Sequence, residues 1–210
     1  MVVELSKKSG KGVSDGVVSE LTTFFGVKPG HADQLREACE RFTQVLRSAD
    51  PRATQKTGLR DSRMVIFDQG RRLLWTTTFE TDWDPYLDDA LLLVGVEAFM
   101  DWMQYIAEDE AEEIRAWLRE SGGADALGRG VSGAELAEAI KASSAGLKQL
   151  IQSHQVPAAA YWNELSDQTV PQIRKAVRVE HAFQQVLDDP AAAQALQQPA
   201  LKPLLEQAAD

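Results

Sequence analysis

Residues 63–80 constrain the fold more than any other part of the chain, because they predict two adjacent strands with apolar side chains on both faces. RMVIFD (63–68) and RRLLWTTTFE (71–80) flank Gln69-Gly70, and two strands joined by a two-residue turn form a β-hairpin. Side chains alternate between the two faces of a strand. On the second strand, one face is mostly aromatic and apolar and the other carries a leucine and two threonines: Leu73, Trp75, Thr77 and Phe79 against Leu74, Thr76 and Thr78. Such a sheet needs cover on both faces, from helices or from a second copy of the chain.

The remaining periodicity predicts further strands and helices around this hairpin. An amphipathic helix is expected over 31–48, where Leu35, Cys39, Phe42 and Leu46 recur at helical spacing. The other expected elements are, in order, a strand at 19–27, a loop at 49–62, a helix from about Pro85 to Glu108, helices at 111–121 and 132–154, a strand at 158–165 and a helix at 169–187.

Without the inserted helices the first six elements read βαββαβ, which is the ferredoxin-like order. The sequence therefore predicts an α+β fold with a four-stranded antiparallel sheet and helices on one face. We expect a flexible tail over 1–18 and a single domain over 19–210, with a helical insertion at about 110–155 and a helical extension at about 169–210. Either the C-terminal helices or a second copy must cover the other sheet face, and the second solution, which we expect, is a homodimer of the dimeric α+β barrel type.

A family resemblance accompanies this pattern. VKPGHADQLREACERF, followed by RMVIFDQGRRLLWTTTFETDWDPYLDDA, resembles the dimeric α+β barrel superfamily over roughly residues 20–95. It is most similar to bacterial proteins, largely of unassigned activity, with a segment of the kind RFVIFDDGRRLLF-x-x-x-F-D-G-x-W-x-x-YLDDF. Thr81-Asp82 departs from the glycine of that pattern. The superfamily includes antibiotic-biosynthesis monooxygenases, small degradative enzymes, chlorite dismutases and dye-decolourising peroxidases, so the resemblance implies a fold and a dimer without fixing a reaction.

Charge and cysteine content exclude several classes of function. A net charge of -10 disfavours nonspecific binding of nucleic acid, because the phosphate backbone would be repelled. The single cysteine, Cys39, excludes an intrachain disulfide and a cysteine zinc cluster. The longest apolar run, 90–96, is too short to span a bilayer, and the N-terminus has no apolar core of signal-peptide length. We therefore expect a cytoplasmic protein without membrane or nucleic-acid partners.

Carboxylates gather at the junction TTTFETDWDPYLDDA (76–90), where a strand is expected to lead into a helix. Asp84 precedes Pro85 and is placed to cap the helix, and Asp88 lies near the positive end of its dipole. The spacing matches no calcium-loop pattern, so no metal site is predicted.

The best candidate for a ligand pocket lies along the sheet. Trp75, Thr77, Phe79 and Tyr161 would line an apolar cavity with two hydroxyls, and Arg63 would add a cation. The same aromatic residues also suit a packed core or an interface. Residues 41–72 hold eight Lys or Arg against three Asp, whereas 80–125 hold fourteen Asp or Glu against two Arg. This separation suits an anionic ligand or a pairing of the two segments.

Three functions are compatible with these features. The first is a homodimeric small-molecule-binding or accessory protein, with no cofactor. The second is a cofactor-free enzyme, monooxygenase- or cyclase-like, acting on an apolar small molecule in the sheet cavity. The third is a haem-binding, peroxidase-related protein, for which His181 and His154 are the candidate axial ligands.

Overall fold

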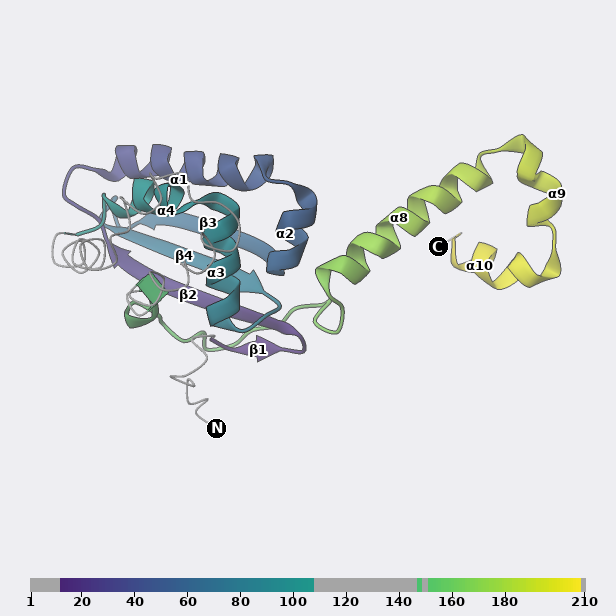
Figure 1. Cartoon of the computed structure of the whole chain (residues 1–210). Coiled ribbons are helices and arrows are strands. Elements are labelled where there is room, and N and C mark those ends of the chain that lie inside the picture. The colour runs from purple at the N-terminus through teal and green to yellow at the C-terminus, as the bar shows by residue number, and fades with distance from the viewer. Residues whose placement is uncertain (1–11, 108–146, 149–150, 209–210) are drawn as a thin grey trace. The chain divides into compact units, whose positions relative to one another are not determined.

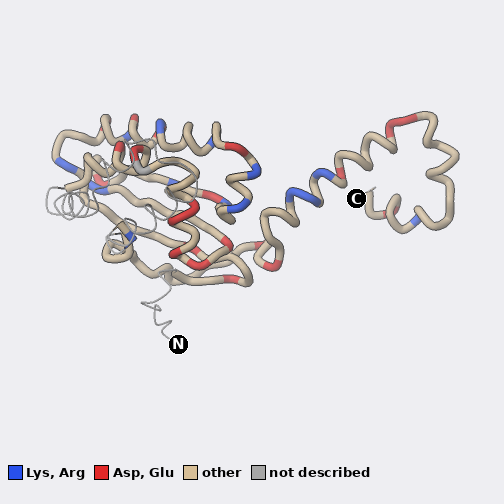
Figure 2. Tube along the Cα trace, viewed as in Figure 1, with Lys and Arg blue, Asp and Glu red and all other residues tan. Residues whose placement is uncertain are grey.

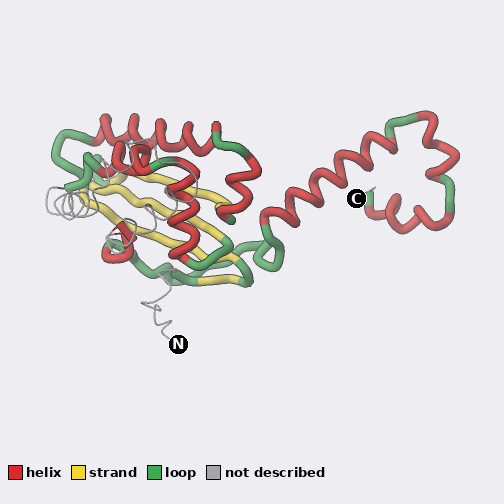
Figure 3. Tube along the Cα trace, viewed as in Figure 1, coloured by secondary structure: helices red, strands yellow, loops and turns green. Residues whose placement is uncertain are grey.

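The computed structural model describes residues 12–107, 147–148 and 151–208, and it divides the chain into two compact units between Thr169 and Val170. The first unit mixes strands and helices, and the second is helical (Figure 3). The predicted helix over 111–121 and most of that over 132–154 lie outside the described residues. The first unit contains β1 (Ser14–Asp15), β2 (Val18–Gly26), α1 (Ala32–Ser48), α2 (Pro51–Thr57), β3 (Leu59–Phe67), β4 (Arg72–Phe79), α3 (Trp83–Val94) and α4 (Val96–Met103).

The sheet has four antiparallel strands in the order β1-β2-β4-β3. The α+β class and the four-stranded antiparallel sheet are therefore confirmed. Trp75 on β4 lies between Thr23 on β2 and Met64 on β3. Side chains alternate along each strand, so the residues of this row share one face of the sheet with Leu21 and Phe25 of β2 and with Leu73, Thr77 and Phe79 of β4.

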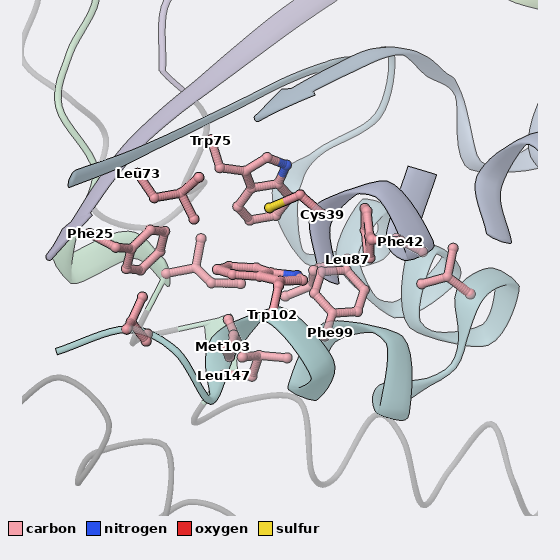
Figure 4. Packing of buried hydrophobic residues seen from close by; sticks show 14 of the residues in the cluster. Phe25, Cys39, Phe42, Leu73, Trp75, Leu87, Phe99, Trp102, Met103 and Leu147 are labelled. Carbon is pink, nitrogen blue, oxygen red and sulfur yellow. The ribbon is translucent and has the colours of Figure 1, made fainter. Parts of the chain in front are cut away.

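Helices α1, α3 and α4 gather on this face of the sheet (Figure 1). Phe42 of α1 packs edge-to-face against Phe99 of α4, with ring centroids 5.1 Å apart. Trp102 of α4 lies 5.6 Å from Phe25 and 5.8 Å from Trp75. Figure 4 shows these side chains interleaved between the sheet and the helices, where burial of apolar and aromatic surface provides most of the stabilisation.

The segment between α1 and β3 corrects the prediction of a loop over 49–62. Residues Pro51–Thr57 form α2, and β3 begins at Leu59. The Asp50 carboxylate accepts the backbone N–H of Arg52, 2.9 Å away, and Gly58 closes the helix at φ 68°. The hairpin turn is also longer than the predicted Gln69-Gly70 pair, since Asp68 and Gln69 both have positive φ and β4 begins at Arg72.

The single helix predicted from Pro85 to Glu108 is two helices. Helix α3 begins at Trp83, so Asp82 and not Asp84 occupies the N-cap position. Gly95 separates α3 from α4 with φ 82° and ψ 151°, a backbone region restricted to glycine. Helix α4 then ends at Met103.

The strand predicted over 158–165 is wrong. The outer edge of β2 pairs with β1 and, further along, through a single antiparallel bridge between Thr23 and Gln155. Pro157 follows and lacks a backbone donor, and the alanines after it have low strand propensity. Residues 14–18, which we expected in the tail, instead form β1, the turn after it and the first residue of β2.

The second unit consists of α8 (Val170–Leu187), the 3₁₀ helix η1 (Pro190–Ala192), α9 (Ala193–Leu196), the 3₁₀ helix η2 (Pro199–Leu201) and α10 (Lys202–Gln207). Helix α8 matches the predicted start and end within one residue. None of its residues is buried, and valines such as Val179 are exposed.

Candidate functional site

Three of the predicted pocket residues, Trp75, Thr77 and Phe79, share the helix-covered face of the sheet and are fully buried. The Trp75 indole N–H donates to the Ser62 hydroxyl, 3.0 Å away. The Thr77 hydroxyl lies 2.6 Å from the phenol of Tyr86 on α3 and donates to the Asp61 carbonyl at 3.2 Å. Their polar atoms are therefore engaged within the protein.

Tyr86 of α3 packs over Thr77 and Phe79 on the helix-covered face of the sheet. Its ring stacks on Phe79 with centroids 4.2 Å apart and planes 8° from parallel. Burial raises the pKa of the Tyr86 phenol, so the group stays neutral and serves as a hydrogen-bond partner of Thr77. Trp75, Thr77 and Phe79 thus contribute to a packed layer beneath α3 and α4.

The other two predicted pocket residues lie elsewhere. Arg63 on β3 pairs with Thr76, on the opposite face, and is exposed. Tyr161 lies in the chain segment after Gln155, and its hydroxyl is 3.5 Å from the Asn163 amide nitrogen. Partial burial raises the pKa of Tyr161, and the nearby carboxylates of Asp61 and Glu20 add to the effect. The five residues do not converge on one point, and their role in binding a ligand stays a prediction.

Neither candidate haem ligand is placed in an open aromatic pocket. His154 stacks on Phe25 with centroids 4.8 Å apart, and its Nδ1 lies 3.1 Å from the Ser153 hydroxyl. His181 is on α8 in the second unit, 74% exposed, with Nε2 3.5 Å from Glu180. One ring face of His154 is thus covered by an aromatic side chain, and its Nδ1 lies beside a hydroxyl. Haem binding stays a prediction for the chain.

The second face of the sheet carries four large apolar side chains among polar and charged ones such as Glu20, Asp61 and Arg72, and it is not part of the buried core. We call it the open face and define it by Thr22 and Phe24 of β2, Arg63, Val65 and Phe67 of β3, and Leu74 and Thr76 of β4. The rings of Phe24 and Phe67 contact edge-to-face at 5.8 Å, and Val65 is 36% exposed. None of these apolar residues belongs to the buried cluster, and no helix described in the first unit packs on them.

One end of the sheet carries a buried ion pair that the sequence did not single out. Arg60 and Glu80 have side chains 9% and 8% exposed, with Nη2 and Oε1 2.9 Å apart. The Arg60 guanidinium also donates to the Asn163 side chain and to the carbonyls of Leu165 and Gln168. Arg60 therefore fastens the segment after Tyr161 to the sheet. In the sequence, the only signal for such pairs was that basic and acidic residues cluster in separate stretches. That clustering does not tell which residues pair.

The acidic junction has a structural partner. Lys148 places its Nζ 2.9 Å from Asp88 Oδ1 and 3.8 Å from Asp84 Oδ1. Arg41 similarly forms a two-pronged pair with Asp101, with Nε and Oδ2 2.8 Å apart (Figure 2 shows the charges along the chain). Among the described residues, no group of three or more His, Cys, Asp or Glu side chains is arranged to hold a metal ion.

A groove of about 560 Å³ runs between α1 and β3. Its walls are formed by one side of α1 and by the inward side chains of the outermost strand: Arg36, Cys39, Glu40, Thr43, Gln44 and Arg47 with Met64 and Ile66. Burial raises the pKa of the Cys39 thiol to about 11, which leaves the thiol protonated and unreactive at neutral pH. A smaller hollow of about 190 Å³ lies between α2 and α3. Periodicity had predicted the buried stripe of α1 but not this groove beside it.

Comparison of the chain with models of protein families, with curated proteins and with solved structures gave no match. Within the described residues, no helix combines the length and the apolar character needed to cross a membrane.

Proposed function

We propose that the chain is the subunit of a homodimeric accessory or small-molecule-binding protein whose two copies pair through the open face. The observation that carries the proposal is the apolar content of that face outside the core. Phe24, Val65, Phe67 and Leu74 are all large apolar residues, and none is packed in the buried cluster. A contiguous apolar patch of this kind marks an interaction surface.

The order of the elements favours a second copy as the cover. Strand β2 lies inside the sheet, flanked by β4, and α1 and α3 follow β2 and β4 on one face, as in a ferredoxin-like subunit. The bridge between Thr23 and Gln155 lies on the edge of β2 where the fourth strand of such a subunit would pair. Two such sheets meeting face to face form the interior of a dimeric α+β barrel, related by a two-fold axis.

Mass measurement in solution by light scattering tests this proposal on the full chain. We expect a dimer at micromolar concentration, and we expect Leu74→Lys and Val65→Lys each to shift the mass to a monomer, because an ammonium group would be buried in the interface. Val179→Lys is the matched control, since Val179 is an exposed valine of α8 outside this face. A wild-type protein that is strictly monomeric would overturn the proposal. So would dimers that persist unchanged in both variants.

The packed layer formed by Trp75, Thr77 and Phe79 explains why we favour a binding or accessory role. A cofactor-free enzyme would need these side chains to line a cavity, whereas their polar atoms bond to Ser62, Tyr86 and the Asp61 carbonyl. Any small ligand would accordingly bind outside this layer, and the dimer interior beside the open face is the enclosed space that the proposed pairing creates.

A further inference from the structure

The outer edge of β3 is the feature that the proposed dimer leaves unused. Strand β3 is nine residues long and lies last in the order of the sheet, so one side of its backbone has no strand partner in the described part of the chain. Unpaired N–H and C=O groups in a row are a template for a further strand. The groove against α1 runs beside this edge, with Met64 and Ile66 as its apolar wall.

The groove carries an excess of positive charge. Arg36 and Arg47 line it from α1, both exposed, and Glu40 is the single carboxylate among its lining residues. Neither arginine forms an ion pair with a described carboxylate, in contrast to Arg41, which pairs with Asp101. The two arginines are eleven positions apart (47 − 36), which is about 16 Å along a helix. That separation suits an elongated anionic partner and exceeds the span of one small anion.

We propose that this groove binds an extended acidic peptide segment of a partner protein, which adds to the free edge of β3 as a fifth strand. Backbone hydrogen bonds to β3 would provide affinity, and alternate side chains of the peptide would point into the groove. Apolar side chains would contact Met64 and Ile66, and carboxylates would pair with Arg36 and Arg47. The groove volume lies within the range of ordinary ligand sites.

An acidic peptide fits this edge better than a second copy of β3 does. Strand β3 contains two arginines, Arg60 and Arg63, and one aspartate, Asp61. Arg60 is paired with Glu80, and Arg63 and Asp61 offset each other, so a second copy would bring no net negative charge to the arginines of the groove, whereas an acidic peptide would. This inference concerns a surface separate from the open face and does not rest on the proposed dimer.

A designed probe tests the inference on the full chain. The probe is a fluorescein-labelled peptide as long as β3, nine residues, in which every second residue is threonine and the positions between them are glutamate and valine in turn, so that one face carries both glutamate and valine. Fluorescence anisotropy at low salt should show saturable binding. Binding should be lost with lysine in place of glutamate, and also with N-methyl groups that block the peptide backbone. The double reversal Arg36→Glu and Arg47→Glu should weaken binding by roughly tenfold or more.

Arg52→Glu is the matched control, because Arg52 is an exposed arginine of α2 that does not line the groove. It should leave the affinity within about twofold, as a distant surface charge is screened. Leu74→Lys should also bind the probe normally, which separates this inference from the proposed dimer. Absence of saturable binding would overturn the inference, as would equal binding of the lysine peptide or equal affinity in the double reversal.

Hydrogen exchange identifies the site of binding. The backbone amides of β3 should exchange more slowly when the probe is present, and those of α8 should not change. If β3 is already protected in free Leu74→Lys, in which the open face no longer pairs, and that protection falls on dilution, a second copy occupies the edge and the peptide inference is wrong.

Discussion

Arg60 shows how a single side chain can organise the chain around one end of the sheet. It lies beside the register shift between Leu59 and Asp61 in the pairing of β3 with β4. From there it reaches Glu80 just beyond β4 and the Asn163 side chain far along the sequence. A planar guanidinium with several donors suits such a junction, because it can satisfy a carboxylate and carbonyl oxygens together.

Replacing Arg60 should strongly destabilise the first unit. Arg60→Ala leaves the Glu80 carboxylate buried without its arginine partner, and we expect the free energy of unfolding to fall by about 3–5 kcal/mol. Urea titration followed by the fluorescence of the buried core tryptophans measures the change. Arg52→Ala, at an exposed arginine of α2 outside the open face, should change it by less than about 0.5 kcal/mol. Equal effects of the two substitutions would contradict this role for Arg60.

Cys39 should make stability depend on alkaline pH. Its thiol pKa rises from the ordinary value of 9.0 to about 11 in the folded protein, mainly because the group is buried. Between these pH values the unfolded chain loses the proton and the folded chain keeps it. The free energy of unfolding should therefore fall as pH rises, by roughly 2–3 kcal/mol in all, and should be unaffected below pH 9.

Unfolding curves at several pH values check this prediction against Cys39→Ala. The burial of Tyr86 also raises its pKa and acts in the same direction, but it is common to both proteins and cancels in the difference. Parallel pH profiles for the two proteins would show that the thiol is not responsible.

Alternation along a strand was enough to predict which residues share a face. Trp75, Thr77 and Phe79 lie together as expected, since the period of two is a local property. Their partners were not predictable in the same way. The contact of Thr77 with Tyr86 depends on where α3 crosses the sheet, and local sequence does not encode that crossing. The segment that carries Tyr161 is held by contacts with residues far away in the chain, such as that of Asn163 with Asp15, so the distance of Tyr161 from Trp75 could not be inferred.

The helices were predicted with different success, depending on how clearly the apolar spacing of the sequence marks where each one starts and ends. Helix α1 follows its amphipathic period within a residue of the predicted start. Helix α2 has seven residues and no apolar stripe, and it depends on Asp50 at its start and Gly58 at its end. The break at Gly95 was missed because the apolar period continues through it, from α3 into α4.

Gly95 should be intolerant of a side chain. Its backbone, at φ 82° and ψ 151°, is in a region where residues with a Cβ are strained by about 1–3 kcal/mol. An added Cβ would also approach the Glu97 carboxylate to 3.0 Å, although that side chain can move. Gly95→Ala should lower the free energy of unfolding by about that amount in urea titration. Glu97→Ala, which leaves the backbone unchanged, should cost less than about 1 kcal/mol. A neutral Gly95→Ala would mean that α3 and α4 can merge into one helix.

The fourth strand was mispredicted because strand pairing is a long-range choice. The outer edge of β2 is taken by Ser14–Asp15 and by the bridge at Gln155, so the aromatic run at 161–162 has no strand to pair with. Instead, the backbone N–H of Val17 donates to the Ser166 carbonyl at 2.8 Å, and that of Asn163 donates to Asp15. Residues 163–168 are thus held to the sheet by individual hydrogen bonds and not by strand pairing.

At the scale of the whole molecule, the two compact units define where the chain can be shortened. Contacts in the first unit extend to Gln168, whose carbonyl accepts a hydrogen bond from Arg60, and the boundary follows at Thr169. A chain that ends at Thr169 keeps every partner of Arg60. A chain that ends at Pro157 loses Asn163, Leu165 and Gln168 together.

Truncation at these two positions should therefore give opposite results. Since each unit is compact by itself, the chain ending at Thr169 should unfold cooperatively, with a free energy of unfolding within about 1 kcal/mol of that of the first unit in the full chain. The chain ending at Pro157 should lose about 3 kcal/mol or more, because Arg60 loses its hydrogen bonds to Asn163, Leu165 and Gln168 and the buried pair of Arg60 with Glu80 loses its cover. Urea unfolding followed by tryptophan fluorescence compares the three chains. If ending at Thr169 destabilises the protein as much as ending at Pro157, the stability of the first unit depends on residues 170–210, and the two units do not fold independently.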